Sequence, residues 1–408
     1  MRFVSSFIFG GSGDFAKSEI TYCDSQHIVV YSTIEIYCNE SIDIERRGIH
    51  MYEQKKAELA KVFTAQSDYI PLSIGVKADG VVTGLGSAWQ RMYDAQATID
   101  IAKMERGNTI KLESDAIPII ESNFLECLVP SLFGAEPYES PGGMADVRPV
   151  FYDVEELEDL QTPDIFGGIM EQTIKHLEYM IKNAPEPFEV CMSRFMSPLD
   201  YAVVMRGGDF YMDLLLEPEL AADFMNKIAD VSIACIRYFR NMLGYAEKDG
   251  QITVRGFYFP GIRLSGDAIV NLSPATIQEV MYPIYRRFAD EFGALMLHYC
   301  CTPAPSGHVL PALLDGCGIT CVDNWQGYPT FFNENRDGLL QDKIGICTDL
   351  DKTVVANPEK LFAEHELFSK VKRKGGRALT VSTNVDTVDE GKRLYDNWRE
   401  FFAKNNWD

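Results

Sequence analysis

From Tyr52 to the C-terminus the sequence repeats one pattern, and this pattern limits the fold more than any other feature. Short apolar runs rich in β-branched residues alternate with longer stretches whose apolar residues recur every three or four positions. This alternation is typical of βα units built around a parallel sheet. The runs that fit strands are 69–75, 116–122, 188–195, 254–264, 294–300, 318–324, 343–349 and 378–384. Eight such units favour an α/β fold of the (β/α)8 TIM-barrel type in a single domain, with a doubly wound open sheet as the alternative.

The first fifty residues differ from the rest of the chain. They mix Gly-Gly-Ser-Gly with short β-branched runs and show no helical period. We therefore expect an N-terminal extension over 1–50, which is poorly ordered or not native, and the barrel over 51–408. Residues 45–51, Glu-Arg-Arg-Gly-Ile-His-Met, could be encoded by a purine-rich ribosome-binding site ahead of a start codon, so one hypothesis is that Met51 is the native start. The alternative is a genuine extension that packs on the barrel.

Charge and cysteine content narrow the class of partner. The formal net charge is −22 at pH 7, so the chain would repel a phosphate backbone or an anionic membrane surface, and we expect neither nucleic acid nor membrane as a partner. No apolar stretch approaches the roughly 20 residues that a membrane helix needs. Ten cysteines in 408 residues are too sparse for a disulfide scaffold, which predicts reduced thiols and a cytoplasmic protein. An oligomer is compatible with the sequence.

Polar side chains lie at the carboxyl ends of the expected strands. In a barrel these positions converge on one cavity, so they are the candidates for a small-molecule site. The substrate-binding candidates are Glu121, Asn123, Arg194, Arg263, Asn324 and Ser382. Asp267 and Asp349 are candidate catalytic acid or base groups, provided that burial raises their pKa. The alternative for both aspartates is a cap on the helix or loop that follows.

The tripeptide His298-Tyr299-Cys300 is the sharpest chemical signal. Alternate residues of a strand point to the same side, so the imidazole of His298 and the thiol of Cys300 would face one metal ion or one substrate. Catalytic zinc usually takes three protein ligands, and Cys347, at another strand end, is the best placed third ligand. The sequence therefore predicts a zinc site of His298, Cys300 and Cys347. The alternative is a chance pattern in which the cysteines are small core residues.

Four segments together resemble the uroporphyrinogen decarboxylase superfamily, which includes the methylcobamide:coenzyme M methyltransferases. They are Phe-Met-Ser-Pro-Leu-Asp-Tyr-Ala at 195–202, Gly-Asp-Ala-Ile through Leu-Ser-Pro at 266–274, Leu-His-Tyr-Cys at 297–300 and Cys-Thr-Asp at 347–349. The resemblance covers the chain from about Ala116 onward and implies a TIM barrel. The His-x-Cys segment is similar to that of the methyltransferase branch, which implies zinc, a catalytic role for His298 and a methyl group supplied by a corrinoid protein.

The sequence departs from the superfamily at two places. No Arg-Gln-Ala-Gly-Arg-Tyr segment, which holds the tetrapyrrole acetates in uroporphyrinogen decarboxylases, occurs between Met51 and Trp89. The last-strand cysteine that completes the zinc site of the methyltransferase branch is replaced by Ser382-Thr383. The first departure argues against a porphyrin substrate, and the second leaves the zinc site incomplete unless Cys347 or Cys301 substitutes.

Three functions follow as hypotheses. The first is a methyltransferase in which zinc activates the acceptor, with the methyl-corrinoid carried by a partner protein. The second is a metal-free decarboxylase of a polycarboxylated, tetrapyrrole-like small molecule, in which Asp349 or Asp267 stabilises a transient cation and Arg194 or Arg263 holds carboxylates. The third is a non-catalytic barrel that binds a corrinoid protein.

Overall fold

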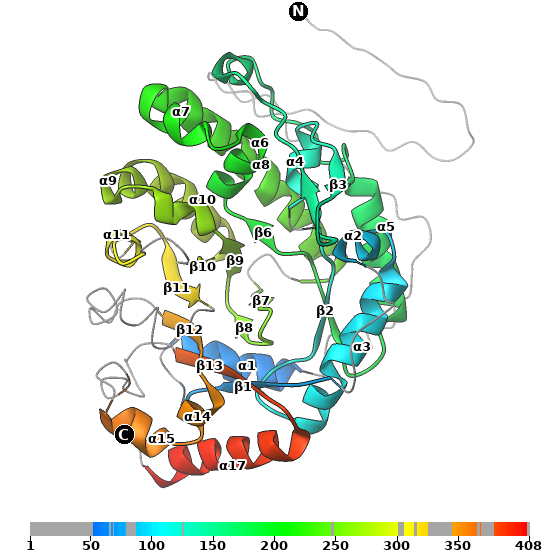
Figure 1. Ribbon diagram of the computed structural model, residues 1–408, viewed down its shortest axis with the longest axis vertical. Coiled ribbons are helices and arrows are strands. Elements are labelled where there is room, and N and C mark those ends of the chain that lie inside the picture. Colours follow the sequence, from blue (N-terminus) through cyan, green and yellow to red (C-terminus); the bar gives the residue numbers. More distant parts are fainter. Residues whose placement is uncertain are drawn as a thin grey trace, which may run out of the picture. The chain divides into compact units, whose positions relative to one another are not determined.

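In a computed structural model, seven parallel strands form one sheet in the order β1-β13-β12-β11-β10-β9-β6 (Figure 1). Their bounds are β1 Leu72–Val76, β6 Phe195–Met196, β9 Ile262–Ser265, β10 Leu295–His298, β11 Ile319–Asn324, β12 Gly345–Asp349 and β13 Leu379–Val385. The strands from β9 to β13 neighbour one another in sequence order, and β1 pairs with β13 at the end of the chain. A doubly wound sheet instead reverses its strand order partway across. The α/β class is therefore confirmed, with the strand order that a barrel requires.

A second, two-stranded parallel sheet completes the set of predicted strands. It pairs β2 (Ile119–Glu121) with β5 (Glu189–Cys191). The single strand predicted over 188–195 is wrong in one respect, because it is two strands with different partners. β5 pairs with β2, and β6 pairs with β9. In the described part of the chain no ladder joins β1 to β2 or β5 to β6, so backbone hydrogen bonds do not close the ring.

Two antiparallel pairs were not predicted. One joins β3 (Pro137–Glu139) to β4 (Ala145–Val147), and the other joins β7 (Gln251–Ile252) to β8 (Tyr258–Phe259). The single strand predicted over 254–264 is therefore divided: it contains β8 of the second pair and the first residues of β9. The turn between β7 and β8 packs against the start of β2, where the backbone N–H of Ile117 donates to the carbonyl of Gly256 at 2.8 Å.

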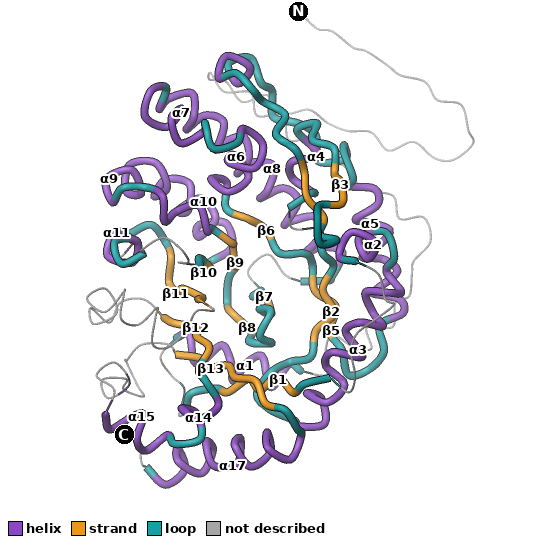
Figure 2. The backbone as a smooth tube through the Cα atoms, viewed as in Figure 1, coloured by secondary structure: helices purple, strands orange, loops and turns teal. Residues whose placement is uncertain are grey.

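Most helices lie outside the strands, as Figure 2 shows, whereas α1 (Glu53–Phe63) packs through Phe63 against a separate cluster of Phe259, Met296, Cys321 and Cys347. The longer ones are α1 Glu53–Phe63, α3 Ala95–Leu112, α5 Met170–Asn183, α6 Pro198–Arg206, α8 Pro218–Met242, α10 Tyr282–Phe292 and α17 Val388–Lys404. The shorter ones are α2 Ala88–Met92, α4 Leu128–Leu132, α7 Phe210–Leu216, α9 Pro274–Thr276, α11 Val309–Leu313, α14 Lys352–Val355 and α15 Pro358–Glu364. Two short 3₁₀ helices, η1 Val154–Leu157 and η2 Asp267–Asn271, and one π-helical segment, η3 Ile277–Met281, complete the set in the described residues. None of the helices in the described residues is both long and apolar enough to span a membrane.

The C-terminal helix α17 illustrates why these segments are helical. The side chain of Thr387 accepts a hydrogen bond from the backbone N–H of Glu390 and so satisfies one of the free amides of the first turn. The buried residues of α17 recur at helical spacing, and the helix packs against α3 and β1. The indole of Trp398, which is fully buried, donates to the carbonyl of Ile70 at 2.8 Å. The pattern of the sequence is thus sufficient to place this helix on the sheet.

Alternation along the strands sorts apolar from polar side chains. In β10, Leu295 and Leu297 belong to the main hydrophobic core under the helices, whereas Met296 belongs to a separate small cluster and His298 follows it on the same face. In β9, Ile262 and Leu264 belong to the main core and alternate with Arg263 and Ser265. The second face is therefore the polar one, and it carries the predicted site residues.

The described residues are 52–64, 67, 69–78, 87–124, 126–245, 249–300, 306–313, 316–324, 345–364, 368 and 379–405. All of them belong to the unit Ile44–Asp408. The expected N-terminal extension and the hypothesis about Met51 lie outside the described residues, as does Cys301.

Candidate active site

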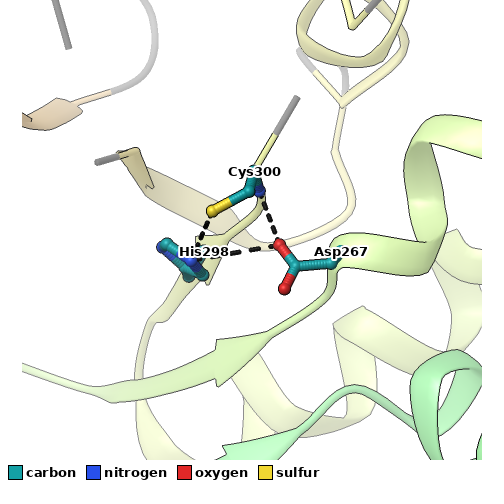
Figure 3. Close-up of side chains that lie close together, drawn as sticks. All are labelled: Asp267, His298 and Cys300. Carbon is teal, nitrogen blue, oxygen red and sulfur yellow. Dashed lines mark hydrogen bonds and ion pairs between the residues drawn. The ribbon is translucent and has the colours of Figure 1, made fainter. Parts of the chain in front are cut away.

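Asp267, His298 and Cys300 come together at the carboxyl ends of β9 and β10 (Figure 3). Nε2 of His298 lies 3.3 Å from Sγ of Cys300 and 3.9 Å from Oδ1 of Asp267. One potential ligand atom from each residue lies within 4.8 Å of the other two. His298 is buried and Asp267 is exposed, so the group opens from the sheet toward the surface. A basic imidazole, a thiol and a carboxylate at this spacing form a donor set for a divalent cation such as zinc.

Backbone contacts fix the segment that carries His298 and Cys300. The backbone N–H of Cys300 donates to Oδ1 of Asp267 at 2.5 Å, and the backbone N–H of Gly266 donates to the carbonyl of His298 at 2.7 Å. Asn324, predicted as a substrate ligand, is fully buried at the end of β11 and donates to the carbonyl of Tyr299 at 2.5 Å. The structure therefore gives Asn324 a supporting position under this segment.

A buried ion pair lies behind His298. Oδ2 of Asp323, on β11, lies 3.5 Å from Nδ1 of His298 and accepts a hydrogen bond from Nε of Arg263 at 2.7 Å. Burial alone would raise the pKa of Asp323, but the charge of Arg263 and hydrogen bonding by His298 outweigh it and hold this pKa well below its usual range. The ionised carboxylate favours a proton on Nδ1, which leaves the lone pair of Nε2 directed at Cys300 and Asp267.

Asp200 supports the same site from α6 and was not predicted from the sequence. Its Oδ1 accepts a hydrogen bond from the backbone N–H of Ala268 at 3.0 Å, and its Oδ2 accepts one from Oγ of Ser197 at 2.8 Å. Burial raises the pKa of Asp200 to about 7. Because Ala268 directly follows Asp267, Asp200 fixes the start of η2. The only signal in the sequence was its place in the segment 195–202.

Asp349 forms a second polar group at the end of β12. Its carboxylate contacts the guanidinium of Arg255 and the hydroxyl of Ser382. Burial raises the pKa of Asp349, although Arg255 and Ser382 act in the opposite direction. Both partners line a cavity of about 880 Å3, which also reaches Arg106 on α3. Ser382 was predicted as a site residue, whereas Arg255 and Arg106 were missed, because neither lies at a strand end.

Glu121 and Arg194, predicted from two different strand ends, form an ion pair. Oε1 of Glu121 lies 3.2 Å from Nε of Arg194, and both side chains are partly buried. Burial raises the pKa of Glu121, and the nearby arginines, Arg194 first, lower it. Asn123 is half-buried two residues beyond the end of β2.

The structure places Cys347 and Arg263 elsewhere than expected. Sγ of Cys347 lies 3.7 Å from Sγ of Cys321, in a buried cluster with Met296 and Phe259. Among the described residues, the ligand group around His298 does not include Cys347, since Asp267 lies there instead. Arg263 is only 1% exposed, and its guanidinium pairs with Asp323 rather than facing the cavity.

Comparisons with known proteins identify the fold. No family model and no curated protein sequence matches the chain. A vitamin B12-independent methionine synthase, so described, from Listeria monocytogenes matches with a TM-score of 0.40 and 12% identity, over 84% of this chain and 98% of that chain. A methyltransferase from Methanosarcina mazei matches with a TM-score of 0.55 and 13% identity, over 85% of this chain and 99% of that chain. The chain therefore shares its fold with the Methanosarcina methyltransferase.

Proposed function

We propose that this protein is a methyltransferase whose acceptor is activated by a zinc ion held by Asp267, His298 and Cys300. The observation that carries the proposal is the convergence of these three donors at the carboxyl ends of parallel strands. Ligands about 2.0–2.3 Å from a shared tetrahedral ion lie about 3.3–3.6 Å from one another. The distances of 3.3 Å from His298 to Cys300 and 3.9 Å from His298 to Asp267 are close to this spacing. Three protein ligands leave one position for an acceptor.

The residues of the chain prepare this donor set. Asp323 orients the imidazole of His298, and Asp267 fixes the backbone of Cys300 by accepting its N–H. When bound, zinc supplies the Lewis acidity that keeps an acceptor thiol deprotonated at neutral pH. The fold shared with a methyltransferase supports the same reaction class. In this proposal the methyl group comes from a corrinoid carried by a partner protein.

Asp349 is the residue best suited to exchange a proton with the acceptor. Its pKa is raised by burial, which brings it nearer to neutral pH, and Ser382 and Arg255 fix its two oxygens. Glu121 and Arg194, which pair with each other beside the two-stranded sheet of β2 and β5, are the proposed contacts for polar groups of the substrate, together with Asn123. Arg263 and Asn324 act in this proposal as supports rather than as substrate ligands.

A methyl-transfer assay tests the proposal. Purified protein is incubated with methylcobalamin and either 2-mercaptoethanesulfonate or homocysteine, and the loss of methylcobalamin absorbance is followed with detection of the methylated thiol. We expect turnover in the wild type and in Cys347→Ala, and a loss of about 100-fold or more in Cys300→Ala. Equal rates in the wild type and Cys300→Ala would contradict the proposal, as would the absence of methylated thiol with either acceptor.

A further inference from the structure

We infer that the cavity beside β1 and β13 is a binding site for a small anionic molecule that carries a carboxylate or phosphate group, held by Arg106 and Arg255. Asp267, His298 and Cys300 do not line this cavity, which adjoins the proposed active site through Arg255 and Ser382, the partners of Asp349. The inference goes beyond the proposed function and stands whether or not Asp267, His298 and Cys300 bind zinc.

The cavity exists because the strands do not pair at this point. Its walls include Ser73 of β1, Ser382 of β13 and the segment Ala116–Pro118 that leads into β2, where the described residues show no ladder between β1 and β2. Helix α3 supplies Arg106, and the turn between β7 and β8 supplies Arg255. At about 880 Å3 the cavity has the size of an ordinary small-molecule site.

Arg106 has unused hydrogen-bonding capacity. It is half-buried, and within the described residues its one hydrogen bond is a long contact of 3.5 Å from Nη2 to the carbonyl of Val254. A guanidinium carries five N–H donors in a planar fork that matches a carboxylate or a phosphate. The carboxylate that acts most strongly on the pKa of Arg106 is Glu121, whose Oε1 already lies 3.2 Å from Arg194. An anion in the cavity would therefore complete the coordination of Arg106.

Arg255 brings a second positive charge to the same cavity. The two guanidinium groups are close enough for the charge of Arg255 to lower the pKa of Arg106, although burial is the larger cause. The carboxylates of Glu121 and Glu105 act on Arg106 in the opposite direction, and an anion in the cavity would add a partner for its guanidinium. Arg255 pairs with Asp349 and adds its positive charge to the cavity wall.

The other charged residues of the cavity wall have partners or lie at its rim. Lys352 pairs with Asp386 and Glu390, and Lys55 donates to the carbonyls of Ser114 and Ala116. The side chain of Asp351 caps α14, while Glu105 and Glu113 are exposed.

Thr383 borders the cavity with a buried side chain. Its side chain is 3% exposed and lines the cavity, and its Oγ1 has no hydrogen-bond partner in the described structure. Buried hydroxyl groups without a partner are rare, because desolvation without a hydrogen bond costs free energy.

Binding of two probes, succinate and inorganic phosphate, tests the inference. Isothermal titration is carried out on metal-free protein so that failure of the zinc proposal does not affect the result. We expect at least one probe to bind the wild type, and Arg106→Met to weaken that binding by about tenfold or more. Lys103→Met, on the exposed face of the same helix, is the matched control and should bind as the wild type does. Which probe binds more tightly distinguishes a carboxylate from a phosphate ligand.

A second measurement covers the case in which Arg106→Met does not fold. Phenylglyoxal modifies arginine side chains, and mass spectrometry of the digested wild type follows the modification of each arginine. The bound probe should slow modification of Arg106 but leave that of the exposed Arg286 unchanged. The inference is overturned if neither probe binds the wild type, if Arg106→Met binds as the wild type does, or if Arg106 is modified equally with and without probe.

Discussion

Nδ1 of His298 lies 3.5 Å from the carboxylate of Asp323 on the neighbouring parallel strand, while Nε2 of the same ring lies 3.3 Å from the thiol of Cys300. The imidazole thus joins a buried ionised carboxylate to the candidate metal site. The two nitrogens have different roles: one is oriented by Asp323, and the other is presented to the ligand group.

The first prediction concerns Asp323→Asn. The amide cannot replace the charge that orients His298, so zinc affinity should fall by about 10–100-fold. Competition with a chromophoric chelator measures this affinity. Asp290→Asn, which removes a surface carboxylate paired with Arg286, is the control and should keep the wild-type affinity. Unchanged affinity in Asp323→Asn would show that this carboxylate does not support the metal site.

The second prediction concerns the pair of Arg263 and Asp323, which is almost fully buried. Arg263→Met should lower the free energy of unfolding by about 3–5 kcal/mol, because it leaves the charge of Asp323 buried without its main partner. Chemical denaturation measures the change, and Arg286→Met on the surface should cost less than about 1 kcal/mol. The double variant Arg263→Met with Asp323→Asn should regain part of the loss. Additive losses in the double variant would argue against a coupled pair.

The third prediction concerns Asp200 and pH. Its folded-state pKa of about 7 lies above the roughly 3.9 of an unfolded aspartate, so the folded state keeps a proton that the unfolded state releases between these values. The contribution of Asp200 to stability therefore falls as pH rises from about 4 to about 7. Asp200→Asn keeps an acceptor for Ala268 and removes this titration, so its stability relative to the wild type should increase over that range. Urea denaturation at the two ends of the range measures the difference, and a constant difference would contradict the assignment.

Much of the fold could be predicted from the sequence, because the apolar residues that become buried recur along it in a regular pattern. Each predicted strand contains or overlaps an observed one, since β-branched runs such as Leu379–Val385 pack one face under helices. The division of 188–195 into β5 and β6 could not be predicted, because it depends on which strands pair on either side. Local propensity says nothing about such partners.

The site was predictable where its residues belong to strands. The prediction that His298 and Cys300 lie together is confirmed by the distance of 3.3 Å, although β10 ends at His298 and Cys300 follows in the loop. Cys347 lies on the expected strand, level with Asp323, but its thiol packs beside Cys321, and the neighbours of a thiol cannot be deduced from residue type. Asp200 and Arg255 reach the sites from a helix and a turn, so their contribution depends on tertiary packing alone.

Measurement of zinc content is the most direct test of whether Asp267, His298 and Cys300 hold a zinc ion. Protein purified without a metal-affinity tag is supplied with zinc, desalted and measured by elemental analysis, alongside Asp267→Ala, His298→Ala, Cys300→Ala and Cys347→Ala. We expect about one zinc per chain in the wild type and in Cys347→Ala, with a loss in the other three variants. A wild type without zinc would contradict this prediction and favour a metal-free reaction centred on Asp349, and zinc that persists in Asp267→Ala but is lost in Cys347→Ala would contradict the ligand set.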